Sequence, residues 1–218
     1  MTTEPALLDS LDPDLTARLA SRRDLFAKAA ARLGALATAP AVLTLAAGEA
    51  FGQGLPGEVA EVLNFALTLE YLEDEFYRTA LGTRGLIPGR FLPVFQQISR
   101  HERAHVRTLA GALGGAAIPK PRFDFTGRGQ YADVFSNFAT FAAVSNTFED
   151  LGVAAYKGQA GNLQGTPVLT TALQIHSVEA RHAAEVRRVR GNFGWDGAFD
   201  QPKTKAEVLA AAGPFIAA

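Results

Sequence analysis

The chain has 218 residues, 48% of them hydrophobic, and a formal net charge of −1. This length favours a single domain with a sizeable core, and a nearly neutral chain has no net field that would recruit nucleic acid. It contains no cysteine, which excludes disulfides, thiolate zinc sites, iron–sulfur clusters and cysteine nucleophiles.

The first 52 residues have the features of an export signal. Residues 21–28, Ser-Arg-Arg-Asp-Leu-Phe-Ala-Lys, resemble a twin-arginine motif. An uncharged apolar run covers residues 33–47, and small residues at 50–52 suit a signal peptidase. The run is shorter than the roughly 20 residues that span a bilayer. We therefore expect export to the periplasm or cell envelope and no permanent membrane span; an amphipathic helix that happens to contain two arginines is the alternative.

Apolar residues recur with a period of 3.6 over four later segments, which predicts four helices. Their expected positions are residues 57–81, 90–113, 131–157 and 166–190. The short connections from the first to the second and from the third to the fourth predict two antiparallel hairpins.

The connection between the hairpins, residues 114–130, is rich in glycine and proline. Its 17 residues can extend to about 56 Å, more than the roughly 36 Å length of the second helix. We therefore predict an all-α four-helix bundle over residues 56–190 with one long crossover. In the tail, residues 191–218, Thr204 and Glu207 form a capping-box pattern that opens a short helix through Ala212. This helix is expected to cover one end of the bundle.

One spacing of polar residues occurs twice on the apolar faces of these helices. The two copies are Glu70, Tyr77, Glu102 and His105, and then Glu149, Tyr156, Glu179 and His182. In each copy the tyrosine follows the first glutamate by seven residues, and the histidine lies three residues after the second glutamate. Burying a lone carboxylate costs on the order of several kcal/mol. Four converging carboxylates also repel one another and would be partly protonated without metal, whereas two divalent cations balance their charge. The pattern predicts a two-metal carboxylate site, and imidazole and carboxylate ligands suit iron or manganese.

With this pattern, the chain resembles the ferritin-like superfamily over about residues 56–190. Residues 63–73, Leu-Asn-Phe-Ala-Leu-Thr-Leu-Glu-Tyr-Leu-Glu, and the tail around residues 204–216 are similar to the desiccation-related ferritin-like proteins. The resemblance implies that the four glutamates and two histidines are the metal ligands. It also implies that one glutamate of each Glu-x-x-His pair bridges the metals, while each histidine binds one.

The implied activity is oxidation of Fe(II), or reduction or dismutation of peroxide, in oxidative or desiccation stress. The substrates would be dioxygen or peroxide, and a homo-oligomer is possible. Tyr77 and Tyr156 are catalytic candidates, either as redox-active phenols or as donors that orient a carboxylate; the alternative is two ordinary buried tyrosines. An iron-binding or storage protein, or a non-enzymatic stress-protection protein, are the competing interpretations. Residues 53–218 carry 16 basic and 16 acidic residues, which does not favour an acidic iron-mineral store.

Several further residues are weaker candidates. Glu73 competes with Glu70 as the ligand of the first helix, and the spacing to the tyrosine favours Glu70. His176 is either an additional ligand or neighbour of the site or, as the simpler alternative, a partly exposed bundle residue. His101 lies off the apolar face and is expected to be solvated. Three acidic residues are expected to border the site and to hydrogen-bond the histidines: Asp74, Asp150 and Glu185.

Overall fold

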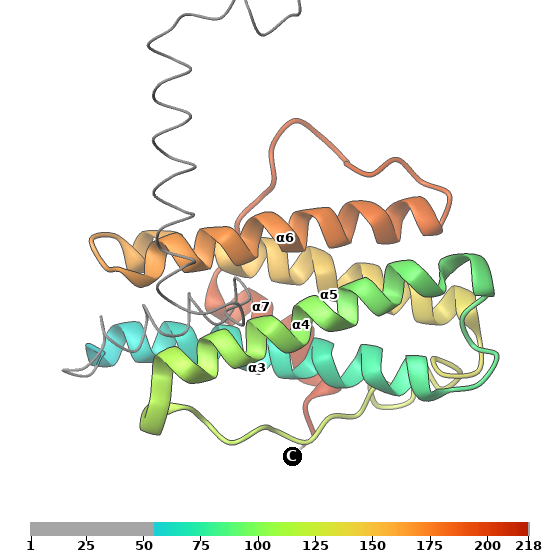
Figure 1. Ribbon diagram of the computed structural model, residues 1–218, viewed down its shortest axis with the longest axis horizontal. Helices are drawn as coiled ribbons and strands as arrows, with labels where there is room; N and C mark the ends of the chain where they lie inside the picture. The colour runs from blue at the N-terminus through green and yellow to red at the C-terminus, as the bar shows by residue number, and fades with distance from the viewer. Residues whose placement is uncertain (1–54, 218) are drawn as a thin grey trace, which may run out of the picture. The chain divides into compact units, whose positions relative to one another are not determined.

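The computed structural model describes residues 55–217, and the predicted signal in residues 1–52 lies outside them. In this part of the chain the regular structure is helical, as predicted (Figure 1). The α-helices are α3 (Gly57–Gly82), α4 (Leu92–Leu113), α5 (Phe138–Gln159), α6 (Val168–Val189) and α7 (Lys205–Ala212). Short 3₁₀ turns precede α4 and follow α4, α5 and α7.

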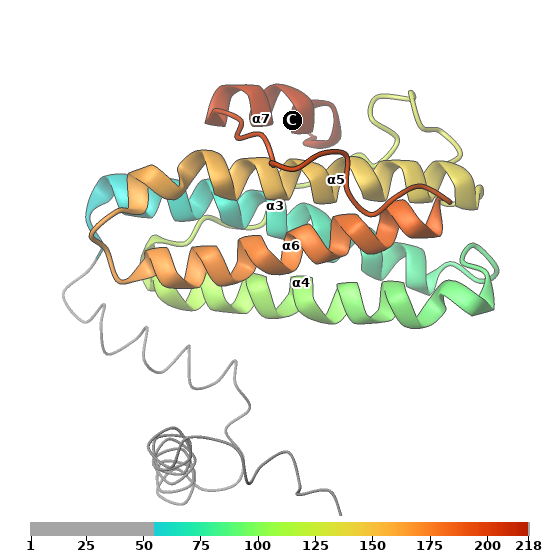
Figure 2. The same cartoon turned by 90° about the horizontal axis from the view of Figure 1, so that it is seen from above.

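The four long helices form two hairpins that pack against each other as a bundle. Helices α3 and α4 are joined by residues 83–91, and α5 and α6 by residues 160–167. Extensive contacts pair α3 with α4 and α5 with α6, and α3 also contacts α5 (Figure 2). The prediction of an all-helical bundle is confirmed.

The crossover between the hairpins runs back along α3. Near the N-terminal end of α3, the Asn64 side chain accepts a hydrogen bond from the Ile118 backbone N–H at 2.9 Å. Further along, Lys120 forms an ion pair with Glu75. The ring of Phe125 then packs on Phe76, with centroids 5.4 Å apart. The segment therefore crosses the length of the bundle and starts α5 at the end opposite to where α4 finished.

The third helix of the bundle begins later than predicted. Residues 131–136 form turns, and α5 starts at Phe138. Asn137 has an extended backbone (φ −127°, ψ 114°), and its side chain accepts a hydrogen bond from the backbone N–H of Ala139 at 3.0 Å. Such an N-cap satisfies a free donor of the first turn and fixes the start of the helix. Tyr131 belongs to the crossover, where its ring stacks on Phe215.

Two of the three apolar clusters of the described residues lie at opposite ends of the bundle, with the polar residues of the duplicated pattern between them. One cluster is aromatic and includes Phe76, Phe95 and Phe141, all fully buried. The other is mainly aliphatic and includes Leu67 and Ile175. The helical periodicity that builds these clusters continues through the polar residues, which are therefore buried in the interior.

Helix α7 lies along the side of the bundle, so the prediction that it covers one end is wrong (Figure 2). Val208 and Ala212 pack against Phe65 of α3 and Leu151 of α5. The helix begins with the predicted capping box, in which the side chain of Thr204 and that of Glu207 each cap a backbone N–H of the other residue.

The chain reaches α7 through a close backbone contact with α5. The Lys203 N–H donates to the Ala154 carbonyl at 3.1 Å. A Cβ atom at Gly158 would lie 1.9 Å from the Lys203 carbonyl oxygen, so only glycine fits there. None of the helices in the described part of the chain combines the length and apolarity needed to cross a membrane.

Candidate metal centre

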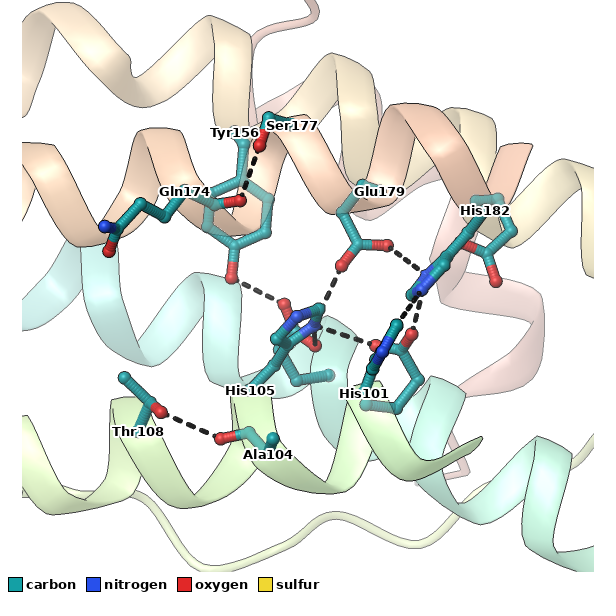
Figure 3. A network of polar contacts seen from close by, with 12 residues as sticks. His101, Ala104, His105, Thr108, Tyr156, Gln174, Ser177, Glu179 and His182 are labelled. Carbon is teal, nitrogen blue, oxygen red and sulfur yellow. Dashed lines mark hydrogen bonds and ion pairs between the residues drawn. The ribbon is translucent and has the colours of Figure 1, made fainter. Parts of the chain in front are cut away.

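All six predicted ligand residues meet in the middle of the bundle. They come from all four long helices: Glu70 from α3, Glu102 and His105 from α4, Glu149 from α5, and Glu179 and His182 from α6. The four glutamates are at most 1% exposed, and His105 and His182 are 8% and 5% exposed. Figure 3 shows His105, Glu179 and His182 converging from α4 and α6.

The ligand atoms fall into two groups, in each of which the atoms lie within 4.8 Å of one another. In the first group, His105 Nδ1 lies 3.2 Å from Glu70 Oε2, 3.2 Å from Glu102 Oε2 and 2.9 Å from Glu179 Oε1. In the second group, His182 Nδ1 lies 2.9 Å from Glu102 Oε1, 3.3 Å from Glu149 Oε2 and 3.5 Å from Glu179 Oε2.

Glu102 and Glu179 belong to both groups, each with one oxygen in either group. A carboxylate arranged in this way can bridge two cations, while each histidine serves only one. This geometry agrees with the sharing of ligands that the family resemblance implies. The role of the six residues as metal ligands stays a prediction.

The hydrogen-bonding state of these residues tests whether a metal fits. Among residues 55–217, seven buried side-chain nitrogen or oxygen atoms have no hydrogen-bond partner. Five of them belong to the two groups: Glu102 Oε1, Glu149 Oε2, both carboxylate oxygens of Glu179, and His182 Nδ1. Their nearest polar neighbours are other ligand atoms of the same group, 2.9–3.5 Å away, so charge attraction and not oriented hydrogen bonds compensates for their burial. Carboxylate oxygen and imidazole nitrogen are suitable donors for divalent iron or manganese, so the residues present fit such ions.

The two tyrosines connect the hairpins by crossed hydrogen bonds. Tyr77 of α3 donates its hydroxyl hydrogen to Glu149 Oε1 on α5. Tyr156 of α5 donates to Glu70 Oε1 on α3, at 2.5 Å (Figure 3). Each glutamate thereby keeps its other oxygen, Oε2, in its ligand group. The tyrosines are placed to orient the carboxylates; their redox activity stays a prediction.

Glu70 and Glu149 hold a proton more tightly than an exposed glutamate does. Burial, the largest effect, raises the pKa of each to about 8. His105 partly opposes this shift at Glu70, and His182 does so at Glu149. In the metal-free protein both carboxyl groups are therefore mainly protonated at pH 7.

Glu102 and Glu179 are ionised instead. Burial opposes their ionisation, but the adjacent His105 and His182 outweigh it and lower the pKa of both carboxyl groups. Burial likewise opposes the charging of the two histidines, yet the surrounding glutamates raise the pKa of both imidazoles well above the usual range. Without metal, two imidazolium ions thus balance two carboxylates in the core.

Glu73 is a fifth buried carboxyl group beside the centre, but it belongs to neither group. Burial and repulsion by Glu179 and the other glutamates raise its pKa well above the usual value, so it is uncharged at neutral pH. Gly152 stands at the corresponding position of the second copy, three residues after Glu149. A Cβ atom at Gly152 would lie 3.5 Å from Glu73 Oε1 and 3.6 Å from Glu179 Oε2, which is ordinary van der Waals contact, so the Glu73 carboxyl group packs next to Gly152.

His101 is half-buried and not fully solvated as predicted, because its ring lies against His182. His101 Nδ1 and His182 Nε2 are 2.8 Å apart, and the rings are nearly parallel with centroids 5.1 Å apart (Figure 3). Burial and the neighbouring His182 lower the pKa of His101, which is therefore uncharged at neutral pH. A helical projection of α4 could not reveal this contact. It shows on which side of α4 His101 lies, but not which residue of α6 packs against that side.

The remaining candidates do not contact the ligand histidines. Asp74 pairs with Arg78 and Arg103, Asp150 pairs with Arg187 at 2.7 Å, and Glu185 pairs with Arg188 at 3.6 Å. The prediction that these acids hydrogen-bond the histidines is therefore wrong. His176 is half-buried and lies outside both groups.

The fold and the site together define a four-helix bundle whose duplicated glutamate–histidine cluster can hold metal ions. A family model described as ferritin-like domain matches residues 58–192. The chain belongs to this family, which confirms the resemblance at the level of the superfamily. No curated protein sequence matches the chain. Its similarity to the desiccation-related proteins stays a prediction.

Proposed function

We propose that this protein binds two iron or manganese ions and uses them to oxidise Fe(II) or to reduce or dismutate peroxide. The observation that carries the proposal is the sharing of Glu102 and Glu179 between two ligand groups that each have their own histidine. Two neighbouring redox metals would supply two-electron chemistry with dioxygen or peroxide and would need no organic cofactor.

The side chains of the protein would bind and orient the ions and keep bulk water away from them. Glu102 and Glu179 provide one oxygen to each position, and the crossed tyrosine bonds hold Glu70 and Glu149 in place. The apolar clusters on either side exclude solvent, which strengthens each charge interaction in the centre.

Metal content after anaerobic loading tests the proposal. Protein exposed to Fe(II) or Mn(II) and then desalted should retain about two ions per chain. The double variant Glu102→Gln, Glu179→Gln keeps the side-chain volumes but removes both shared carboxylates, and should retain none. The matched control is Glu61→Gln, Glu185→Gln, which makes the same chemical change at two exposed glutamates. Circular dichroism would verify that all the variants remain helical.

Activity assays then separate the candidate functions. The loaded parent protein and the control should consume peroxide or oxidise added Fe(II), and the Glu102, Glu179 variant should do neither. A parent protein that retains no ion after loading would refute the proposal and favour non-enzymatic stress protection. A protein that takes up many ions per chain without turnover would favour iron storage.

We also propose that the protein works outside the cytoplasm, because residues 21–28 resemble a twin-arginine motif and an apolar run follows them. Protein recovered from the extracytoplasmic fraction should begin near residue 52 by N-terminal sequencing. Recovery of the chain from the cytoplasm alone would contradict export.

A further inference from the structure

His101 is tied to the metal centre although it belongs to neither ligand group. It directly precedes Glu102 on α4 and extends across to α6, where its Nδ1 atom lies 2.8 Å from Nε2 of His182 (Figure 3). The opposite atom of the His182 ring, Nδ1, is the one in the second group. His182 is therefore held between the cluster on one side and His101 on the other.

The direction of this hydrogen bond follows from the chemistry of the ring. A neutral imidazole carries one N–H, so a cation on Nδ1 of His182 leaves the hydrogen on Nε2. Nε2–H then donates to Nδ1 of His101, whose own hydrogen must lie on Nε2. That atom faces the side-chain amide nitrogen of Gln97, whose oxygen accepts a hydrogen bond from Arg100. With a metal at the second group, the Gln97 amide would turn its oxygen toward the Nε2–H of His101 and give up the hydrogen bond from Arg100.

The other half of the duplicated pattern has no such partner for its histidine. The residue that corresponds to His101, directly before Glu179, is Val178. A valine side chain cannot accept or donate a hydrogen bond. His105 and His182, which are equivalent in the pattern, therefore differ in how their rings are supported.

We propose that His101 is a positioning residue that fixes the orientation and the tautomer of His182, so that the two metal positions are inequivalent. The inference rests on the proposed two-metal function. A partner that holds the outer nitrogen of a ligand histidine keeps the inner lone pair directed at the metal, and its loss typically lowers metal affinity about 10- to 100-fold. The position with His182 is thus the one that depends on His101.

Three variants separate the hydrogen bond from packing. His101→Phe keeps a planar ring against His182 but removes the acceptor. His101→Asn places an amide oxygen close to the position of Nδ1 and can accept the same bond. Val178→Ala is the control at the corresponding position of the other half. Stepwise binding of Co(II), followed by its visible absorption under anaerobic conditions, gives the two affinities without any assay of turnover.

In His101→Phe, one of the two Co(II) affinities should fall about 10- to 100-fold, with the other within about threefold of the parent value. His101→Asn should recover most of the loss, and Val178→Ala should change neither affinity appreciably. Unchanged affinities in His101→Phe would overturn the proposal. An equal loss at both positions that His101→Asn does not rescue would also overturn it, because it would show a merely structural role.

A measurement on the metal-free protein distinguishes failure of this proposal from failure of the proposed function. The ¹⁵N chemical shift of His182 Nε2 reports its hydrogen bond, and we expect it to change in His101→Phe and to be largely restored in His101→Asn. If the parent binds no metal but shows this pattern, the two-metal function is refuted while the positioning of His182 stands. If the parent binds two ions but the ¹⁵N shift of His182 Nε2 is the same in the parent, His101→Phe and His101→Asn, the function stands and the role of His101 is refuted.

Discussion

Metal binding to this centre should release about four protons at pH 7. In the metal-free protein, burial raises the pKa of Glu70 and Glu149 to about 8. His105 and His182 are protonated as well, because the surrounding glutamates raise the pKa of both against the effect of burial. Each of these four groups must lose its proton before its atom can bind a cation.

The sign and size of the pH dependence follow from this count. Protons compete with metal, so apparent affinity rises with pH. Below about pH 8 each ion displaces about two protons, one from a histidine and one from a glutamate. The affinity per ion should therefore increase roughly a hundredfold per pH unit, or about 2.7 kcal/mol. Above pH 8, Glu70 and Glu149 are already ionised, so the dependence weakens and the total release falls by about two protons.

Proton release can be measured directly. Loading with Mn(II) in a weakly buffered solution that contains a pH indicator gives the number of protons, and calorimetry in buffers of different ionisation enthalpy gives it independently. The count should be about four at pH 7 and clearly lower at pH 9. Release of one proton or none at pH 7, or a count that does not change between these pH values, would refute the assigned protonation states.

Two further substitutions test the tyrosine contacts and the attachment of the tail. Tyr156→Phe removes the hydrogen bond to Glu70 and should destabilise the metal-free protein by about 1–3 kcal/mol in urea unfolding; an unchanged midpoint would contradict the role of this bond. Gly158→Ala places a methyl group against the Lys203 carbonyl oxygen and should lower the free energy of unfolding, measured by thermal denaturation, by about 1–3 kcal/mol. The residues after α6 should also become more sensitive to protease. Gly161→Ala is its control, because a Cβ atom there meets nothing within 4 Å; equal effects of the two substitutions would argue against the clash.

The positions of the helices could largely be predicted from the sequence, because a continuous apolar face identifies each one. The first helix, predicted for residues 57–81, extends over Gly57–Gly82. The start of α5 was predicted wrongly for a specific reason. Tyr131 and Val134 continue the period of the helix, but they pack as part of the crossover. The capping signal of Asn137, which was present in the sequence, is what ends the irregular segment.

The convergence of Glu70, Glu102, His105 and their counterparts could be predicted because helical spacing places them on the same faces as the core residues. The crossed bonds from Tyr77 to Glu149 and from Tyr156 to Glu70 could not, since they depend on how two hairpins face each other. The same holds for the side-by-side packing of α7 with α3 and α5. These features depend on tertiary contacts that periodicity along one helix does not encode.

The sharing of Glu102 and Glu179 has a consequence for assembly. Each hairpin alone supplies only three of the four residues of a group, and the fourth comes from the other hairpin. A metal ion would therefore act as a cross-link between segments about 75 residues apart in the chain, and its binding energy would add to the free energy of folding by mass action. The isolated hairpins would gain none of this stabilisation. The presence of metal in the centre would therefore indicate that the two hairpins have packed against each other.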